Sequence, residues 1–213
     1  MTPPCTRDTW RNHASVRNSL RVGKEERELD QEEYRAAIAA LRRQKDTWFA
    51  EDDDSPIPLG ERSTGFTGLR YFDVAPSYRV SARLHPLARP EQITLGSTKG
   101  DPRQQIHFAD LRFTIDGQTC QLAAFKDATE ESSAVFVPFR DATSGHESYG
   151  AGRYLEFEDT ADPSVPHDVV LDFNLAYNPW CAYNSAYSCT LPPVQNRLAV
   201  AIRAGEMTYS DDH

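Results

Sequence analysis

The amino-acid sequence predicts a mainly β protein, an antiparallel barrel or two-layer sandwich of about eight or nine strands with one N-terminal α-helix. Two observations support this fold class. The spacing of apolar residues is helical only before about residue 50, and from Gly65 onward it alternates with a period of two. Turn-forming residues also recur often there and delimit many short strands, and an open sheet of that size would expose long edges.

The helix is expected over residues 31–49. Asp30 is a suitable N-cap, and acidic side chains follow it in the first turn. One stripe at helical spacing is formed by Tyr34, Ile38, Leu41, Lys45, Trp48 and Phe49. The helix ends before Pro56 and Pro58, which cannot continue it. We expect this helix to cover the side or the end of a sheet.

The surest strand pair is a hairpin with Asp116 and Gly117 as its two-residue turn, because an Asp-Gly pair accepts the positive φ angles of such a turn. In the first arm the apolar phase changes, which predicts a β-bulge near Ala109 and Asp110. The alternation predicts strands over residues 78–84, 93–98, 105–115, 118–125, 134–139, 153–158, 168–173 and 198–203.

The length of 213 residues is enough for one hydrophobic core, and nothing in the chain repeats. Residues 1–28 are polar and contain two prolines, so we expect a disordered or loosely attached arm there. Residues 29–206 are expected to form a single β-rich domain with the N-terminal helix, and residues 207–213 a flexible tail.

The composition excludes several partners. A net charge of -9 argues against binding along a nucleic-acid backbone, which requires a basic patch. No run approaches the roughly 20 apolar residues that a membrane helix needs. The N-terminal residues lack the apolar core of a secretory signal. We therefore expect a soluble, acidic, cytoplasmic protein with neither a nucleic-acid nor a membrane partner.

The four cysteines are too few for a disulfide scaffold, and no zinc-type CxxC is present. Cys181 and Cys189 flank a segment rich in Tyr, Asn and Ser that we expect to turn back on itself, which would place the two thiols near each other. Three interpretations stay open for them: two packed thiols, a pair that closes a disulfide, or a reactive or ligand thiol.

Polar residues are concentrated between residues 137 and 204. Asp172 and Asn174 project from the same face at the end of one expected strand. Arg153 is in phase with apolar neighbours, so its charge requires a carboxylate partner. The candidates for that partner are Asp141, Glu147 and Asp172. Two interpretations stay open: a structural network at one end of the barrel, and an anion-receiving or general-acid site.

Three function classes are compatible with these residues. The leading hypothesis is a small-molecule-binding protein with a polar pocket; the others are a hydrolase-type enzyme that uses a carboxylate or Cys181, and a protein-interaction module. The expected ligand-binding residues are Arg153, Asp172, Asn174, Tyr177, Asn178, Tyr183, Asp141, Glu147 and Tyr149. Cys181 and Cys189 are the reactive-thiol candidates. No metal site is expected, and the spacing indicates no particular cofactor or oligomeric state.

Several motifs resemble a known family. The segments FVPFRDATSG, SYGAGRYLEFE, LDFNLAYNPWCAYNSAYSCTLPP and NRLAVAIRAGE are similar to the motifs of domain-of-unknown-function family 1684, and GFTGLRYF and RRQKDTWF also fit. The resemblance covers residues 31–205. The family pattern usually has Glu where this chain has Gln195, so the resemblance implies no catalytic carboxylate at that position. Positions that match are Glu147, Tyr149, Arg153, Asp172, Asn174, Tyr177, Asn178, Cys181, Cys189 and Asn196.

Overall fold

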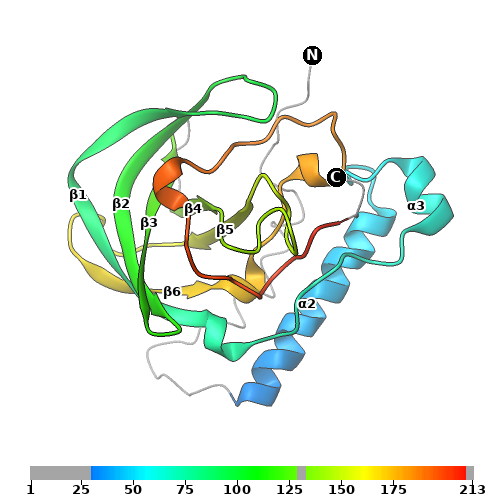
Figure 1. The fold of residues 1–213 in the computed structure, drawn as a ribbon, viewed down its shortest axis with the longest axis horizontal. Helices are drawn as coiled ribbons and strands as arrows, with labels where there is room; N and C mark the ends of the chain where they lie inside the picture. The colour runs from blue at the N-terminus through cyan, green and yellow to red at the C-terminus, as the bar shows by residue number, and fades with distance from the viewer. Residues whose placement is uncertain (1–29, 129–132, 210–213) are drawn as a thin grey trace.

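A curled antiparallel sheet of six strands forms the body of the molecule, in the order β5-β4-β3-β2-β1-β6 (Figure 1). The computed structural model describes residues 30–128 and 133–209. The strands are β1 (Arg79–Leu95), β2 (Arg103–Ile115), β3 (Gln118–Asp127), β4 (Ala134–Phe139), β5 (Arg153–Glu158) and β6 (His167–Asp172). Since β5 and β6 are the two edges, the sheet is an open half-barrel.

The expected count of eight or nine strands is wrong, for two reasons. The strands expected over 78–84 and 93–98 are one continuous strand, β1, whose register with β2 shifts between Pro86 and Glu91. Residues 198–203 form no strand. Leu198 N donates to Arg140 O and Val200 O accepts from Ala142 N, both just after β4. The carbonyl of Ile202 accepts from an arginine side chain instead of from a strand partner.

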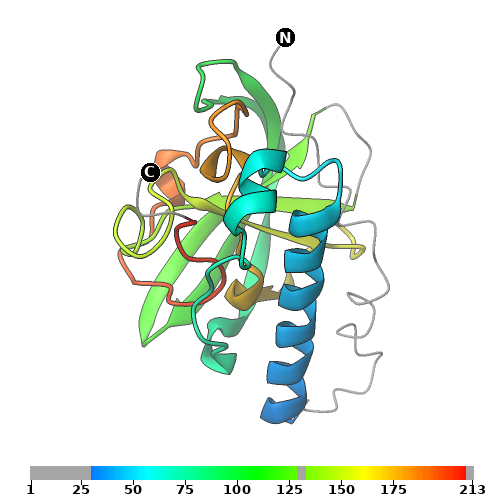
Figure 2. The ribbon, with the colours of Figure 1, turned by 90° about the vertical axis from the view of Figure 1, so that its right-hand side faces the viewer.

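The predicted helix is confirmed as α2 (Gln31–Glu51), which begins after Asp30, whose carboxylate accepts a hydrogen bond from Glu32 N. A short helix, α3 (Leu59–Gly65), follows. Figure 2 shows α2 running along the height of the molecule with α3 beside its C-terminal end. Buried residues on α2 are Tyr34, Ile38, Lys45 and Phe49.

The predicted hairpin and bulge are also confirmed. Asp116 and Gly117 have φ angles of 50° and 74°, as a tight hairpin turn requires. The register between β2 and β3 shifts between His107 and Ala109, so the extra residue is Phe108. The Asp-Gly turn and the alternating pattern together therefore located this part of the sheet.

Two apolar clusters stabilise the fold. The larger fills the half-barrel and includes Leu84, Leu111, Leu122, Phe139 and Phe173. The smaller, here called the aromatic cluster, lies between α2 and the loop that follows β6; its buried members are Phe49, Ile57, Leu69, Trp180, Cys181, Tyr183 and Cys189. Short 3-10 turns shape the loops: η2 (Pro76–Tyr78), η3 (Phe173–Leu175), η4 (Trp180–Ala182) and η5 (Val194–Asn196).

The C-terminal segment, residues 197–209, runs between the sheet and α2 (Figure 1). The expected arm over residues 1–28 and residues 210–213 of the expected tail lie outside the described residues. Within the tail, Met207 N donates to Arg70 O at 2.9 Å and Thr208 N to Glu147 O at 3.1 Å. Over the part of the chain that the structure describes, no helix is long and apolar enough to span a membrane.

Candidate functional site

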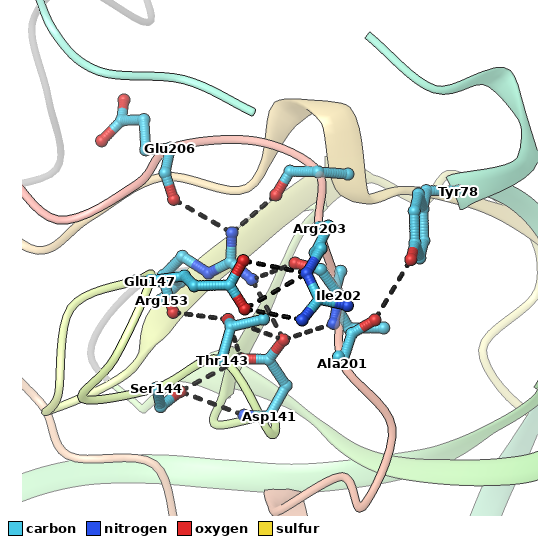
Figure 3. A network of polar contacts seen from close by, with 12 residues as sticks. Tyr78, Asp141, Thr143, Ser144, Glu147, Arg153, Ala201, Ile202, Arg203 and Glu206 are labelled. Atoms are coloured by element: carbon cyan, nitrogen blue, oxygen red, sulfur yellow. Dashed lines mark hydrogen bonds and ion pairs between the residues drawn. The ribbon is translucent and has the colours of Figure 1, made fainter. Parts of the chain in front are cut away.

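Arg153 is buried and paired with a carboxylate, as its strand phase predicts. Arg153 is 1% exposed, and its Nη2 lies 3.3 Å from Asp141 Oδ2. Of the three carboxylates that the sequence offered, Asp141 is therefore the partner. The remaining guanidinium bonds go to main-chain carbonyls of the C-terminal segment: Ile202 O at 2.8 Å, Ala204 O at 2.6 Å and Glu206 O at 3.0 Å (Figure 3).

Asp141 is also bonded on several sides. It accepts hydrogen bonds from Ile202 N at 2.6 Å, Thr143 Oγ1 at 2.8 Å and Ser144 Oγ at 3.1 Å. Burial lowers the pKa of Arg153, and the neighbouring Asp141 opposes that shift. The pair thus joins the turn after β4 to the C-terminal segment by bonds that a strand ladder would otherwise supply.

Glu147 lies on the surface of the same turn. Both of its carboxylate oxygens accept hydrogen bonds from Arg203, with 2.8 Å between Arg203 Nη2 and Glu147 Oε1 (Figure 3). Arg203 lowers the pKa of Glu147. Because the Arg203 side chain is 57% exposed, we expect this pair to contribute little to stability.

Asp172 and Asn174 lie together, as predicted, at the end of β6. Both oxygens of Asp172 accept the hydroxyl of Tyr34 on α2 at 2.8 Å. Asn174 binds the main chain of Ala75 twice, each bond 2.8 Å long. Burial raises the pKa of Asp172. These bonds hold α2 and the chain before β1, whereas those of Arg153 hold the C-terminal segment.

Glu206 organises a second buried group, which the sequence reasoning missed. Its Oε1 lies 2.5 Å from Lys45 Nζ, and the side chains are 2% and 6% exposed. Its Oε2 accepts the main-chain N–H of Asn178 at 2.8 Å and the hydroxyl of Tyr183. Lys45 Nζ also lies over the ring of Tyr177, 5.2 Å from its centroid. One carboxylate thus holds both ends of the loop 178–183.

That loop carries Cys181, and the structure places the two candidate thiols together. Cys181 N donates to Cys189 Sγ at 3.2 Å, and Tyr149 OH lies 3.6 Å from Cys181 Sγ. Both cysteines are free, and their residues are 9% and 0% exposed. The expected proximity of the thiols is therefore confirmed.

Hydrogen bonds favour the thiolate of Cys181. The hydrogen bond with Cys189 lowers the thiol pKa most, and burial raises it. Hydrogen bonds with Tyr149 and Thr98 lower it further, so that the pKa of Cys181 falls to about 7. Burial raises the pKa of Tyr149, which therefore stays a hydroxyl donor near neutral pH. The contrast is Cys120 of β3, whose thiol pKa is raised by burial.

Aromatic rings surround the thiols. Trp180 and Tyr187 pack edge to face with centroids 5.0 Å apart, and the indole Nε1 of Trp180 is buried without a hydrogen-bond partner among the described residues. The other titratable side chains of the aromatic cluster are Tyr71, Tyr149, Tyr183, Tyr187 and Tyr209. Of these tyrosines, Tyr149 is the one whose hydroxyl lies 3.6 Å from Cys181 Sγ.

The structure does not bring the sequence-predicted residues together in one site. The largest group lies around the loop 178–183 and contains Tyr149, Asn178, Cys181, Tyr183 and Cys189. We call these five residues, together with Lys45 and Glu206, the thiol site. Arg153 and Asp141 adjoin it through the main chain of Glu206. Asp172 and Asn174 lie at the start of α2, Tyr177 donates to Glu156 at 2.9 Å, and Glu147 lies at the surface.

The sequence contains a signal for Lys45 but none for Glu206. Lys45 is a charged residue on the apolar stripe of the helix, and such a residue needs a buried partner. The sequence could not identify that partner, because Glu206 is 161 residues away. Nowhere in residues 30–128 and 133–209 do three His, Cys, Asp or Glu side chains gather as metal ligands.

Comparison with known proteins gives a consistent result. A family described as "Protein of unknown function (DUF1684)" matches residues 64–207. The solution NMR structure of an uncharacterised Haloarcula marismortui protein, from gene locus rrnAC0354, is 44% identical, with a TM-score of 0.67. The alignment covers 85% of this chain and 98% of that one. No curated protein matches the chain at a significant level.

Proposed function

From the premise that this chain belongs to the DUF1684 family of proteins of unknown function, we propose that it binds a small electrophilic molecule at the thiol site and reacts with it through Cys181. The observation that carries this proposal is the contact of the Cys181 sulfur with the Tyr149 hydroxyl, beside a second thiol that accepts a hydrogen bond from Cys181 N. A thiolate is the reactive form of cysteine, and such donors increase its population near neutral pH.

The surrounding structure supports a reacting role for Cys181. Glu206 binds Asn178 N and the Tyr183 hydroxyl, which lie on either side of Cys181 in the chain. Lys45 neutralises that carboxylate in a buried environment. A nucleophile must be held in one geometry to react efficiently, and this arrangement fixes the loop that presents the sulfur.

The same surroundings restrict the class of molecule. The aromatic rings around the thiols favour a small molecule that is largely uncharged. The unpartnered indole N–H of Trp180 offers a donor for an oxygen of that molecule. A small neutral compound with an electrophilic atom bonded to oxygen satisfies both conditions.

The test is the rate of alkylation by iodoacetamide as a function of pH, read for each cysteine by peptide mass spectrometry. The variant C5S is used so that the thiols measured are Cys120, Cys181 and Cys189. We expect the Cys181 rate to rise with an inflection near pH 7. We expect Cys120, whose pKa is raised, to react at least about tenfold more slowly.

Tyr149→Phe is the matched variant, because it removes only the hydroxyl that contacts the sulfur. Its inflection should move to higher pH while the fold persists. Tyr78→Phe is the control, since Tyr78 packs against the larger apolar cluster and its hydroxyl donates to Ala201 O at 3.1 Å. Equal rates for Cys181 and Cys120 across the pH range would reject the proposed function.

Binding of a small polar molecule without reaction is the second candidate, and it is the function that the sequence favoured. Arg42 donates to Phe72 O at 2.8 Å, but its Nε and Nη2 are buried with no hydrogen-bond partner among the described residues. Asn178 Oδ1 is likewise buried with no hydrogen-bond partner among the described residues. Native mass spectrometry should then detect a bound small molecule on the wild type and none on Arg42→Met. If neither protein carries a bound molecule, this candidate is rejected.

A further inference from the structure

We propose that Cys181 and Cys189 form a dithiol that reduces hydroperoxides, with Cys181 as the residue attacked first by the oxidant and Cys189 as the residue that closes the disulfide. This inference rests on the proposed function, because it names the substrate class of the same thiol. It goes further in assigning a chemical role to the second cysteine.

Placement of the two sulfurs carries the inference. Cys189 Sγ accepts a hydrogen bond from Cys181 N, with 3.2 Å between the two atoms. A disulfide requires Cα atoms within about 7 Å, and a sulfur already at the partner's main chain is compatible with that limit. A disulfide between them therefore needs only a local movement.

Their exposure assigns the order of reaction. Cys181 is 9% exposed and has the Tyr149 hydroxyl beside it, whereas Cys189 is completely buried. A molecule arriving from solvent therefore meets Cys181 first. Cys189 is accessible only to a group that is already on Cys181, which is the property of a resolving thiol.

The main chain around Cys189 favours the same division. The main chain of Cys189 is held by two hydrogen bonds with Thr98. Cys189 N donates to Thr98 Oγ1 at 3.1 Å, and Cys189 O accepts a hydrogen bond from Thr98 N at 2.9 Å. These bonds attach it to the loop between β1 and β2. Because Glu206 also fixes the loop 178–183, the movement that joins the sulfurs is a rotation of the Cys181 side chain.

The chemistry balances in two steps. The Cys181 thiolate attacks one peroxide oxygen, an S–O bond forms, the O–O bond breaks, and the departing alkoxide takes a proton to leave as an alcohol. The Cys189 sulfur then attacks the sulfenic acid, an S–S bond forms, the S–O bond breaks, and water leaves. The dithiol loses two electrons and the hydroperoxide gains them; an external thiol returns the disulfide to the dithiol.

Hydroperoxides also match the ligand properties given above. They are small and uncharged, and the oxygen that leaves can accept a hydrogen bond as its charge develops. Tyr149 OH lies 3.6 Å from Cys181 Sγ, and the neighbouring residue, Trp180, has a buried indole N–H with no hydrogen-bond partner among the described residues. The Tyr149 hydroxyl would stabilise the departing oxygen.

The experiment treats the folded C5S protein with one equivalent of hydrogen peroxide at pH 7.5, blocks the remaining thiols with iodoacetamide, and digests it without reduction. We expect a peptide that joins Cys181 to Cys189, with Cys120 alkylated as the unreacted control. The variant C5S/C189S should stop at the sulfenic acid, which dimedone captures on Cys181. The variant C5S/C181S should leave Cys189 reduced.

The outcomes separate the two proposals. If Cys181 is alkylated faster than Cys120 but peroxide gives neither the joined peptide nor the dimedone adduct, the hydroperoxide inference is rejected and the proposed function stands. If Cys181 is neither alkylated nor oxidised faster than Cys120, both are rejected. The alkylation rates and the joined peptide are read on the C5S protein, so they decide both proposals even if C5S/C189S or C5S/C181S fails to fold.

Discussion

Lys45 of α2 and Glu206 of the C-terminal segment form a buried ion pair, with 2.5 Å between Nζ and Oε1. The pair connects the helix to a segment that lies inside the half-barrel. The second oxygen of Glu206 binds Asn178 and Tyr183, so the same carboxylate fixes the loop that carries Cys181. The stability of the fold and the geometry of the thiol site therefore depend on one pair.

Lys45→Met should leave Glu206 buried without its cation. Loss of one member of a buried pair costs about 3 to 5 kcal/mol, and we expect the free energy of unfolding in urea to fall by that amount. Lys99→Met is the control, because Lys99 is exposed and its ammonium donates to the carbonyl of Ala186. Equal stability of the two variants would contradict the prediction.

Arg153→Leu should destabilise the protein by about 3 to 5 kcal/mol, because Asp141 and three carbonyls lose their donor together. Arg203→Leu removes an exposed arginine and should cost less than about 1 kcal/mol. Thermal unfolding of both variants beside the wild type measures the difference. An unchanged melting temperature for Arg153→Leu would show that the buried pair contributes nothing.

Gly205→Ala should be far more damaging than Gly100→Ala. Both glycines have positive φ, 78° and 84°, so alanine is strained at either position by about 1 to 2 kcal/mol. Only at Gly205 would the new Cβ lie 2.4 Å from Ala176 O and 2.7 Å from Phe173 O. We expect a total loss of roughly 2 to 5 kcal/mol there. Equal losses in urea denaturation would mean that the close approach can relax.

The Cys181 thiol should make stability depend on pH. Its pKa is about 7 in the folded protein, below its unfolded value, so its contribution is complete above the unfolded pKa and is lost as the pH falls through about 7. The free energy of unfolding of the wild type relative to Cys181→Ser should rise between pH 6 and pH 9, by roughly 2 kcal/mol at most.

Cys120→Ser is the control for that prediction. Burial raises the Cys120 pKa, so its contribution is present at low pH and is lost as the pH rises through the unfolded thiol pKa. The difference between wild type and Cys120→Ser should therefore decrease with pH. Parallel slopes for the two serine variants would contradict the assigned direction of the Cys181 shift.

Local pattern was enough to predict the elements whose formation depends on neighbouring residues. The helix after Asp30, the turn at Asp116 and Gly117 and the bulge near Ala109 all follow from spacing, capping and φ preference. The burial of Arg153 with a carboxylate also followed, because a strand's alternation assigns a face to each side chain and an unpaired buried charge is too costly.

The sequence by itself thus determined the helix, the hairpin, the resemblance to the family, the need of Arg153 for a partner and the approach of Cys181 to Cys189. Only the tertiary structure decided that residues 198–203 form no strand, that Asp141 is the partner, and that Lys45 meets Glu206. The physical reason is that periodicity reports which face a residue occupies, whereas contacts between distant segments depend on how the whole sheet curls and on which donors reach each buried carbonyl and carboxylate.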